Sequence, residues 1–379
     1  MSLPGQPVSF VDPRAEAVIA HLTGAGYSRS EPPILQPASI FFDSGEDLRA
    51  QLYLTSDLSG ADYCLRPEYT IPVLTSYLAS NSAGARAAFC YCGPVFRFRP
   101  GKDSEFTQAG IESFGRGDRE AADAEILALA LAAAAAAKPK STPASRLAVK
   151  IGDAGLFSKL LEALDLSPQW RRRIARGHGQ GKSLASILSL GLNGTDRSGV
   201  LGVLEGADKQ GARALVEDLL SIAGIAPAGG RTPTEIADRF LEQAALKTGS
   251  GFPPEKRAVI EQFLSVEGNP LDASARLRVL ASDAKLDLSA ILDNFDSRLG
   301  SIAGQGLDIA KLHFSAPFTR NLDYYTGFVF EAYEQGASEP AVGGGRYDGL
   351  PQALGATAPI PAIGAAIWIG RLSPSRGEP

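Results

Sequence analysis

The stretch that most constrains this chain is Arg320 to Glu331, RNLDYYTGFVFE, which holds an arginine, two acids and two adjacent tyrosines within twelve residues. Its second half is rich in aromatic and β-branched residues, which favours a strand, and Gly327 marks a bend or a close backbone approach. Because neighbouring side chains of a strand face opposite ways, only one of Tyr324 and Tyr325 is expected to enter a given pocket. Such a density of polar groups on a strand predicts a ligand pocket.

Three successive glycines, Gly343 to Gly345, follow a dozen residues later and begin the run GGGRYDG. Without side chains, they leave backbone open to close approach by a ligand. Taken singly, each stretch is as consistent with a core strand and a turn. Together they resemble the two histidine-recognition motifs of histidyl-tRNA synthetases, RGLDYYTG-x-x-FE and GGGRYDGL. The resemblance implies a histidine pocket that includes Arg320, Tyr324, Tyr325 and Gly344.

A third stretch, CLRPEYT from Cys64 to Thr70, resembles the LRPEGT motif of the same family. In that family the glutamate and threonine approach the ammonium group of the amino acid, which here implies Glu68 and Thr70. The assignment is chemically reasonable, because an ammonium group taken out of water needs a carboxylate and further acceptors. The alternative is a helix N-terminus at which acidic residues interact with the helix dipole.

Residues 89 to 115 resemble motif 2 of class II aminoacyl-tRNA synthetases, a strand, a loop and a returning antiparallel strand. The resemblance implies that Arg97 is the motif arginine, that Gln108 helps to bind the amino acid, and that Glu112 contacts the imidazole ring. A buried imidazole N–H without an acceptor would cost about 1–3 kcal/mol. Glu112 is therefore expected to select histidine over other amino acids of similar size.

Near the N-terminus, residues 13 to 26 have the apolar spacing of an amphipathic helix, and Tyr27 to Gln36 is expected to be extended. This pattern resembles motif 1, which implies a self-dimer formed through Tyr27 to Pro37. His21 and His313 are interpreted as core or boundary histidines, since neither has a nearby sequence partner that would make it a catalytic base.

The middle of the chain is predicted to be mostly helical. An alanine-rich helix runs from Asp118 to near Lys140, a strand spans 147–151, and further helices are expected at 212–219, 233–245 and 254–264. The run RGHGQGKS at 176–183 fails as a phosphate-binding loop, because Arg176 stands where that motif needs glycine. His178 is accordingly expected in a surface loop.

The C-terminal stretch 361–372 resembles motif 3, a strand followed by a helix, with Arg371 as its arginine. Three departures from the family are expected to lie on the nucleotide side. The loop between Arg97 and Gln108 is three residues shorter and lacks the glutamate beside the motif arginine. Trp368 and Gly370 replace a small and an acidic residue of motif 3, and Tyr69 replaces the glycine of LRPEGT.

Composition argues against several other classes of protein. The 379 residues carry a formal net charge of -5, which gives no general reason to expect a nucleic-acid partner, and Arg171 to Arg173 is interpreted as a solvated helix face. The N-terminus does not resemble an export signal, and the longest apolar run, Ile126 to Ala137, is too short for a membrane span. Three cysteines without a second cysteine or histidine cluster favour reduced thiols over a metal site, and hence the cytoplasm.

Only eight residues follow Arg371, so no anticodon-binding domain is expected and tRNA recognition is not predicted. The combination resembles the regulatory subunits of ATP phosphoribosyltransferase. It implies an α+β fold, with a class II synthetase-like antiparallel sheet flanked by helices at 1–152 and 305–379 and a mostly helical insertion at 153–304.

The same resemblance implies a protein without its own catalysis, cofactor or metal, with histidine as a regulatory ligand. Its partner is expected to be a short-form ATP phosphoribosyltransferase catalytic subunit, in a hetero-octamer of the histidine biosynthetic pathway. The alternative is a histidyl-adenylate-forming enzyme that acts on a non-tRNA acceptor, for which Arg97, Arg320 and Arg371 are the best support.

Overall fold

A computed structural model describes residues 12–42, 46–138, 147–189, 252–320 and 324–372. The chain divides into two compact units. Unit 1 comprises Met1–Leu156, Val266–Val279 and Ser289–Pro379, and unit 2 comprises Phe157–Ser265 and Leu280–Leu288. The boundaries 152 and 305 remain a prediction, and the whole of α13 (Ser289–Gly304), inside the predicted insertion, belongs to unit 1.

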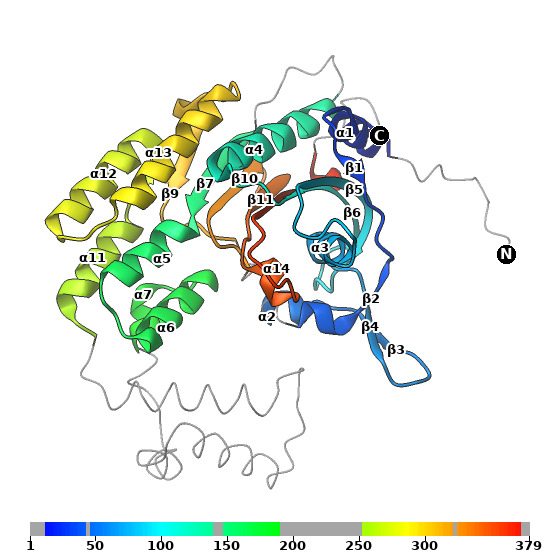
Figure 1. The fold of residues 1–379 in the computed structure, drawn as a ribbon, viewed down its shortest axis with the longest axis horizontal. Helices are drawn as coiled ribbons and strands as arrows, with labels where there is room; N and C mark the ends of the chain where they lie inside the picture. The colour runs from blue at the N-terminus through cyan, green and yellow to red at the C-terminus, as the bar shows by residue number, and fades with distance from the viewer. Residues whose placement is uncertain (1–11, 43–45, 139–146, 190–251, 321–323, 373–379) are drawn as a thin grey trace, which may run out of the picture. The chain divides into compact units, whose positions relative to one another are not determined.

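Unit 1 is built on a nine-stranded sheet in the order β1-β5-β6-β12-β11-β10-β7-β9-β8 (Figure 1). All neighbours are antiparallel except the pairs β1–β5 and β7–β9, so the predicted antiparallel sheet flanked by helices is confirmed, with two parallel pairings. The strands are β1 (Ser28–Arg29), β5 (Ala87–Phe96), β6 (Glu105–Phe114), β7 (Ala148–Asp153), β8 (Glu267–Gly268), β9 (Leu312–Ser315), β10 (Phe328–Tyr333), β11 (Val342–Arg346) and β12 (Ala362–Trp368).

Helices cover both faces of this sheet. On one face α1 (Pro13–Gly24) contacts β5 and β6, and α4 (Arg119–Ala136) contacts β6, β10, β11 and β12. Asp12 caps α1 by accepting the N–H of Arg14 at 2.9 Å, and Pro13 suits the first turn because its missing N–H would be unpaired there. α4 begins at the predicted place but ends earlier than Lys140.

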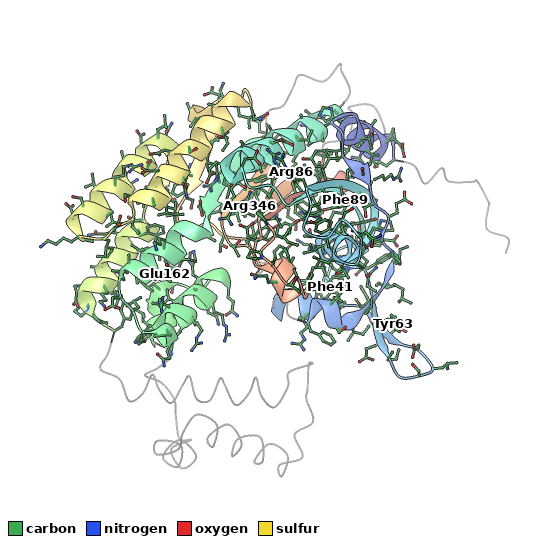
Figure 2. The ribbon with its side chains drawn as sticks, viewed as in Figure 1. Phe41, Tyr63, Arg86, Phe89, Glu162 and Arg346 are labelled. Carbon is green, nitrogen blue, oxygen red and sulfur yellow. The ribbon has the colours of Figure 1, made fainter. Side chains whose placement is uncertain are left out.

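On the other face α3 (Thr70–Leu78) lies inside the curve of β5 and β6 (Figure 1). Its side chains join Phe41, Tyr91 and Phe114 in one buried cluster, and the partly buried Phe89 packs against it. Phe41 and Phe89 are labelled in Figure 2. The short elements η1 (Ala38–Phe41), α2 (Glu46–Arg49) and α14 (Leu350–Ala353) belong to the same region of unit 1. A three-stranded sheet, β2-β4-β3, is formed by β2 (Leu35–Pro37), β3 (Leu54–Ser56) and β4 (Asp62–Leu65).

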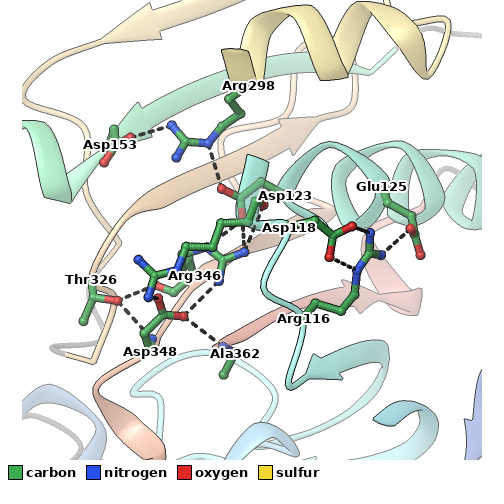
Figure 3. Close-up of polar contacts among 11 residues, drawn as sticks. Arg116, Asp118, Asp123, Glu125, Asp153, Arg298, Thr326, Arg346, Asp348 and Ala362 are labelled. Carbon is green, nitrogen blue, oxygen red and sulfur yellow. Dashed lines mark hydrogen bonds and ion pairs between the residues drawn. The ribbon is translucent and has the colours of Figure 1, made fainter. Parts of the chain in front are cut away.

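A buried ion network ties α13 to α4 and the sheet (Figure 3). Asp123 on α4 is fully buried and accepts from Arg298 at 2.7 Å and from Arg346 at 2.6 Å. Arg298 also donates to Asp153 at 2.7 Å, and Arg346 donates to Asp348 at 2.9 Å. One carboxylate therefore holds two guanidinium groups from segments that are far apart in sequence.

Unit 2 contains α5 (Ala154–Ala163, from Phe157 on), α6 (Pro168–Gly179), α7 (Leu184–Ser189) and α11 (Pro254–Leu264). The last helix is confirmed at its predicted bounds, whereas the helices predicted at 212–219 and 233–245 lie outside the described residues. His178 was predicted to lie in a surface loop, and this is wrong. It lies on α6, and its ring centroid is 4.4 Å from that of Phe157. Burial lowers the pKa of His178.

Two other expectations about isolated polar residues are wrong or incomplete. His21 and His313 are exposed, not core or boundary residues. In the Arg171 to Arg173 tract, Arg173 is half-buried and donates to the carbonyl of Ile187 at 2.8 Å.

Cys64 and Cys90 are buried free thiols. Among the described residues no helix is long and apolar enough to cross a membrane, and no cluster of three or more potential metal ligands occurs.

Candidate functional site

A cavity of about 390 Å³ opens in unit 1, between β6, β12, the start of α3 and the segment that precedes β10. Seven of the nine residues predicted to bind histidine line it. They are Glu68, Thr70, Arg97, Gln108, Arg320, Tyr324 and Tyr325. These residues come from separate stretches of the chain, and the central strands β6, β12, β11 and β10 bring them together because they are neighbours in the sheet.

Glu68 serves two purposes at once. Its carboxylate accepts the backbone N–H groups of Thr70 at 2.7 Å and Ile71 at 2.8 Å, so it caps α3, and it also lines the cavity. Burial raises its pKa, while these N–H groups and the charge of Arg97 act in the opposite direction. The helix-cap and ligand-acceptor interpretations of this motif are therefore compatible, because a carboxylate has about four lone-pair sites.

Gln108 lines the cavity and has an unused acceptor. Its side chain is 2% exposed, and Nε2 donates to the hydroxyl of Tyr91 at 3.4 Å. Its Oε1 is buried and has no hydrogen-bond partner among the described residues. An unpaired buried acceptor costs free energy, so a ligand N–H that reaches Oε1 would bind favourably.

Glu112 lies behind the cavity wall and is fully buried. Three hydroxyls surround its carboxyl group, those of Thr70 at 2.7 Å, Tyr91 at 3.3 Å and Tyr347, which makes the closest contact. A Cβ atom at Gly364 would lie 1.6 Å from Glu112 Oε2, so only glycine leaves room for this carboxyl group. Thr70 and Tyr347 line the cavity and separate Glu112 from it.

Burial raises the pKa of Glu112 from 4.5 to about 8. Between these values the folded chain holds a proton that the unfolded chain lacks, so the stabilisation present below pH 4.5 is lost as the pH rises through 8. We expect the free energy of unfolding of the wild type to fall more between pH 6.5 and 9 than that of Glu112→Gln. Urea titrations in a Trp170→Phe background, where Trp368 alone reports on unit 1, measure this, and parallel pH profiles would contradict it.

The guanidinium group of Arg320 is fixed by two side-chain contacts. It donates to Glu331 at 3.2 Å and to the hydroxyl of Tyr325 at 3.0 Å. A Cβ atom at Gly343 would lie 2.6 Å from its Nη2, so glycine is required there for the close approach of this guanidinium group. The glycine run is thus buried between β10 and β12 and makes room for side chains of the chain itself, which corrects the prediction of an open backbone.

Gly344 does not line the cavity. A Cβ atom there would point to Phe330 and Ala365, at 2.8 Å from each side chain, whereas Gly343 and Gly345 face Arg320 and Tyr325. Conversely, both Tyr324 and Tyr325 line the cavity, and the prediction that only one would enter is wrong. The two residues precede β10, so the alternation of a strand does not apply to them; 321–323 lie outside the described residues.

On the expected nucleotide side, Trp368, Arg371 and Glu339 also border a second space of about 410 Å³. Trp368 lines the cavity, and its ring lies 4.7 Å from the guanidinium carbon of Arg371 and 5.6 Å from that of Arg320. Arg371 donates to the carbonyl of Pro340 at 2.9 Å and pairs with Glu339 at 2.8 Å, and Glu339 also contacts Lys102. The predicted strand is β12, but the helix predicted to carry Arg371 is only a single 3-10 turn, η4 (Ile369–Arg371), which follows β12 directly.

Tyr69 does not belong to this side, contrary to the prediction. It is 2% exposed, does not line the cavity and stacks on Tyr91 at 4.3 Å. The sequence reasoning also missed Glu331 and Tyr347 as site residues. Both residues lie inside the histidine motifs. Glu331 is the acid that follows FVF, and Tyr347 is the tyrosine that follows GGGR, so both could have been identified from the sequence.

Comparison with known proteins gives a consistent result. The family model described as histidyl-tRNA synthetase matches residues 11–217 and 176–372. An ATP phosphoribosyltransferase regulatory subunit from Brucella anthropi is 38% identical over 356 residues, which cover 92% of this chain and 93% of that protein. Its counterpart from Brucella canis is 40% identical over 357 residues, with 92% and 93% covered. The chain belongs to the ATP phosphoribosyltransferase regulatory subunit family.

Solved structures agree with this family assignment in fold. A Bacillus halodurans protein described as an ATP phosphoribosyltransferase regulatory subunit/histidyl-tRNA synthetase matches with a TM-score of 0.63 at 20% identity, over 98% of this chain and 83% of its own. A histidyl-tRNA synthetase from Nostoc matches with a TM-score of 0.58 at 16% identity, over 98% and 75%. The chain therefore has the class II synthetase-like α+β fold that the motifs predicted.

Proposed function

We propose that this protein is a non-catalytic chain that binds L-histidine in the cavity and thereby controls a separate, short-form ATP phosphoribosyltransferase catalytic subunit. The observation that carries the proposal is the contrast between the two sides of one cavity. Acceptors suited to an amino acid are retained and partly unused on one side, whereas on the other side Trp368 and the Arg371–Glu339 pair stand at the expected nucleotide position.

The free acceptors fit a bound histidine. Its ammonium group would be satisfied by Glu68 and by the unpaired Oε1 of Gln108, since a desolvated cation requires charged and neutral acceptors. Its carboxylate would face Arg320 and Arg97, both of which line the cavity. Its imidazole would be directed toward Tyr347 and Thr70, whose hydroxyls both donate to Glu112 and so depend on it for their orientation.

The first test is reconstitution. The purified chain should have no ATP phosphoribosyltransferase activity by itself and should raise the activity of the short catalytic subunit when the two are mixed. L-histidine should then inhibit the mixture, with a coupling free energy of about 1–3 kcal/mol between the two ligand states. A catalytic subunit that is fully active without this chain would refute the activating function.

The competing function is an enzyme that forms histidyl-adenylate for a non-tRNA acceptor. Its specific support is that Arg97, Arg320 and Arg371 all line the cavity, as they would in an adenylate-forming site. A pyrophosphate-exchange assay with L-histidine and ATP separates the two functions. Sustained exchange would replace the regulatory proposal.

We propose further that the chain acts in the cytoplasm, without tRNA, metal or cofactor. Histidine binding should therefore be unchanged when a chelator is added.

Self-association through β2 belongs to the same proposal. β2 is an edge strand, and two large apolar side chains are exposed along it: Ile34, just before the strand, is 44% exposed, and Leu35, its first residue, is 49% exposed. A second copy that pairs along this edge would bury them, and such dimers would combine with catalytic subunits into a hetero-octamer.

A charge at this edge should prevent the pairing. We expect Leu35→Asp to weaken the dimer about ten- to a hundredfold, because the interface would then bury a carboxylate that has no partner, and such burial costs free energy. Light scattering over a concentration series measures the molar mass of each variant and so its tendency to dimerise. Leu271→Asp on α12 (Pro270–Asp283), where the leucine is 59% exposed, is the matched control. Equal masses for wild type and Leu35→Asp at every concentration would remove β2 from the interface.

A further inference from the structure

Tyr69 occupies a position that the motif similarity does not explain, and its surroundings are built for it. A Cβ atom at Gly93 would lie 2.3 Å from the hydroxyl of Tyr69, so only glycine at position 93 leaves space for that group. The ring stacks on Tyr91 with planes 5° from parallel. The hydroxyl accepts from Arg66 Nη2 at 2.6 Å, and the Arg66 guanidinium carbon lies 3.8 Å from the ring centroid.

One end of this stack reaches the acceptors of the cavity. The hydroxyl of Tyr91 accepts from Gln108 Nε2 at 3.4 Å and donates to Glu112 Oε1 at 3.3 Å. Both distances are at the long end for hydrogen bonds, which leaves the hydroxyl weakly held. A ligand that engages Gln108 or the hydroxyls around Glu112 would therefore change the partners of Tyr91.

The other end reaches the extended segment 30–37, which contains β2. Arg66 is 3% exposed, and its guanidinium group donates to the carbonyls of Pro32, in a close contact, and of Pro33 at 3.5 Å. Its backbone N–H donates to the carbonyl of Ile34 at 2.8 Å. The segment is also held by the pairing of β2 with β4 and by the bond from the Ser30 N–H to the carbonyl of Cys90, so the Arg66 side chain acts mainly on the carbonyls of Pro32 and Pro33 between these anchors.

Arg66 is also incompletely satisfied. Its Nε is buried and has no hydrogen-bond partner among the described residues, although Nη2 makes a further bond to the carbonyl of Pro94 at 2.9 Å. A buried donor without a partner costs free energy, so an arrangement in which Nε gains an acceptor would recover part of that cost. A group of this kind can respond to a small displacement of its neighbours.

We propose that occupancy of the cavity is transmitted through Tyr91, Tyr69 and Arg66 to the segment 30–37. Ligand contact changes the partners of the Tyr91 hydroxyl, the flat stack carries the ring displacement to Tyr69, and the guanidinium group follows the Tyr69 hydroxyl and moves the carbonyls that it holds. This inference rests on the proposed function, because it takes L-histidine as the ligand. By linkage, whatever pairs with β2 changes histidine affinity by the same factor.

Amide hydrogen exchange on the full chain, with and without saturating L-histidine, tests the inference. In the wild type, histidine should slow exchange in β6 and change exchange in the peptide that covers 28–37 by about threefold or more. Tyr69→Phe keeps the stack and removes the hydroxyl, so the β6 effect should remain while the change at 28–37 disappears. Tyr77→Phe is the control, since that buried hydroxyl bonds to Ala85 and Gly84 and does not contact Arg66.

A second variant guards against a misleading result. Gly93→Ala forces the Tyr69 hydroxyl away, so it should alter exchange at 28–37 even without histidine, and adding Tyr69→Phe should return exchange to the value of Tyr69→Phe alone. Two results would overturn the coupling while leaving the histidine site in place. In the first, histidine protects β6 in the wild type but leaves exchange at 28–37 unchanged. In the second, histidine changes exchange at 28–37 equally in the wild type and in Tyr69→Phe. If β6 is not protected in the wild type, the proposed function itself fails.

Discussion

Replacing Asp123 with alanine should destabilise unit 1 by about 3–5 kcal/mol, because it leaves two guanidinium groups buried without their shared carboxylate. Arg298 and Arg346 both bond to Asp123, and their side chains are only 7% and 5% exposed, so water cannot take its place (Figure 3). Asp153 and Asp348 each retain one contact with these arginines but cannot neutralise both at the centre of the network.

Urea unfolding followed by Trp368 fluorescence in the Trp170→Phe background measures the loss. Asp293→Ala is the matched control, because its partner Arg278 is an exposed arginine and surface ion pairs contribute about 0–1 kcal/mol. The network also predicts a coupling between sites: once Asp123 is absent, Arg298→Met should cost less than it does in the wild type. A loss under about 1 kcal/mol in Asp123→Ala would show that the network is not a main support of the fold.

The second large effect is expected at the ligand site, where Glu112→Ala should weaken L-histidine binding about ten- to a hundredfold. The variant removes the acceptor of the Thr70 and Tyr347 hydroxyls, so these groups turn and no longer present the same pattern to the imidazole. Activation of the catalytic subunit should persist while inhibition by histidine weakens, because Glu112 is fully buried and its loss removes no group from the surface.

Calorimetry on the isolated chain measures the affinity, and circular dichroism checks that the variant is folded. Glu125→Ala on α4 is the control, since that carboxylate pairs with Arg116 and accepts from Tyr27, outside the cavity. Glu112→Gln should have an intermediate affinity, because the amide oxygen still accepts from one hydroxyl. Unchanged affinity in Glu112→Ala would mean that histidine binds elsewhere.

The sequence motifs predicted the content of the cavity well. Residues 68–70, 97–108 and 320–325 were expected to meet, and seven of them line one cavity because strands β6, β12, β11 and β10 are consecutive in the sheet. The class II fold was predicted for the same reason. Its sheet places these motifs side by side, and each motif retained enough residue types to be matched one by one.

Features that depend on contacts distant in sequence were not predicted. The strand rule failed for Tyr324 and Tyr325, because the strand begins only at Phe328 and the preceding residues turn both rings to one side. Tyr69 was expected beside a nucleotide, but the glycine at position 93 that accommodates it lies on another element, so local periodicity gave no sign of it. The Asp123 network joins residues 175 and 223 positions apart, which no pattern of spacing reveals.

The contact of Glu339 with Lys102 and Arg371 bears on how readily such a chain could be converted into an enzyme. Its carboxylate pairs with both cations that would otherwise be available to a polyphosphate, and the Trp368 ring contacts both Arg371 and Arg320. Removing Glu339 alone leaves the indole in place, and removing Trp368 alone leaves Arg371 paired. Directed evolution toward amino-acid activation would therefore need both changes in one variant before selection detects either, and a library of single substitutions should yield none.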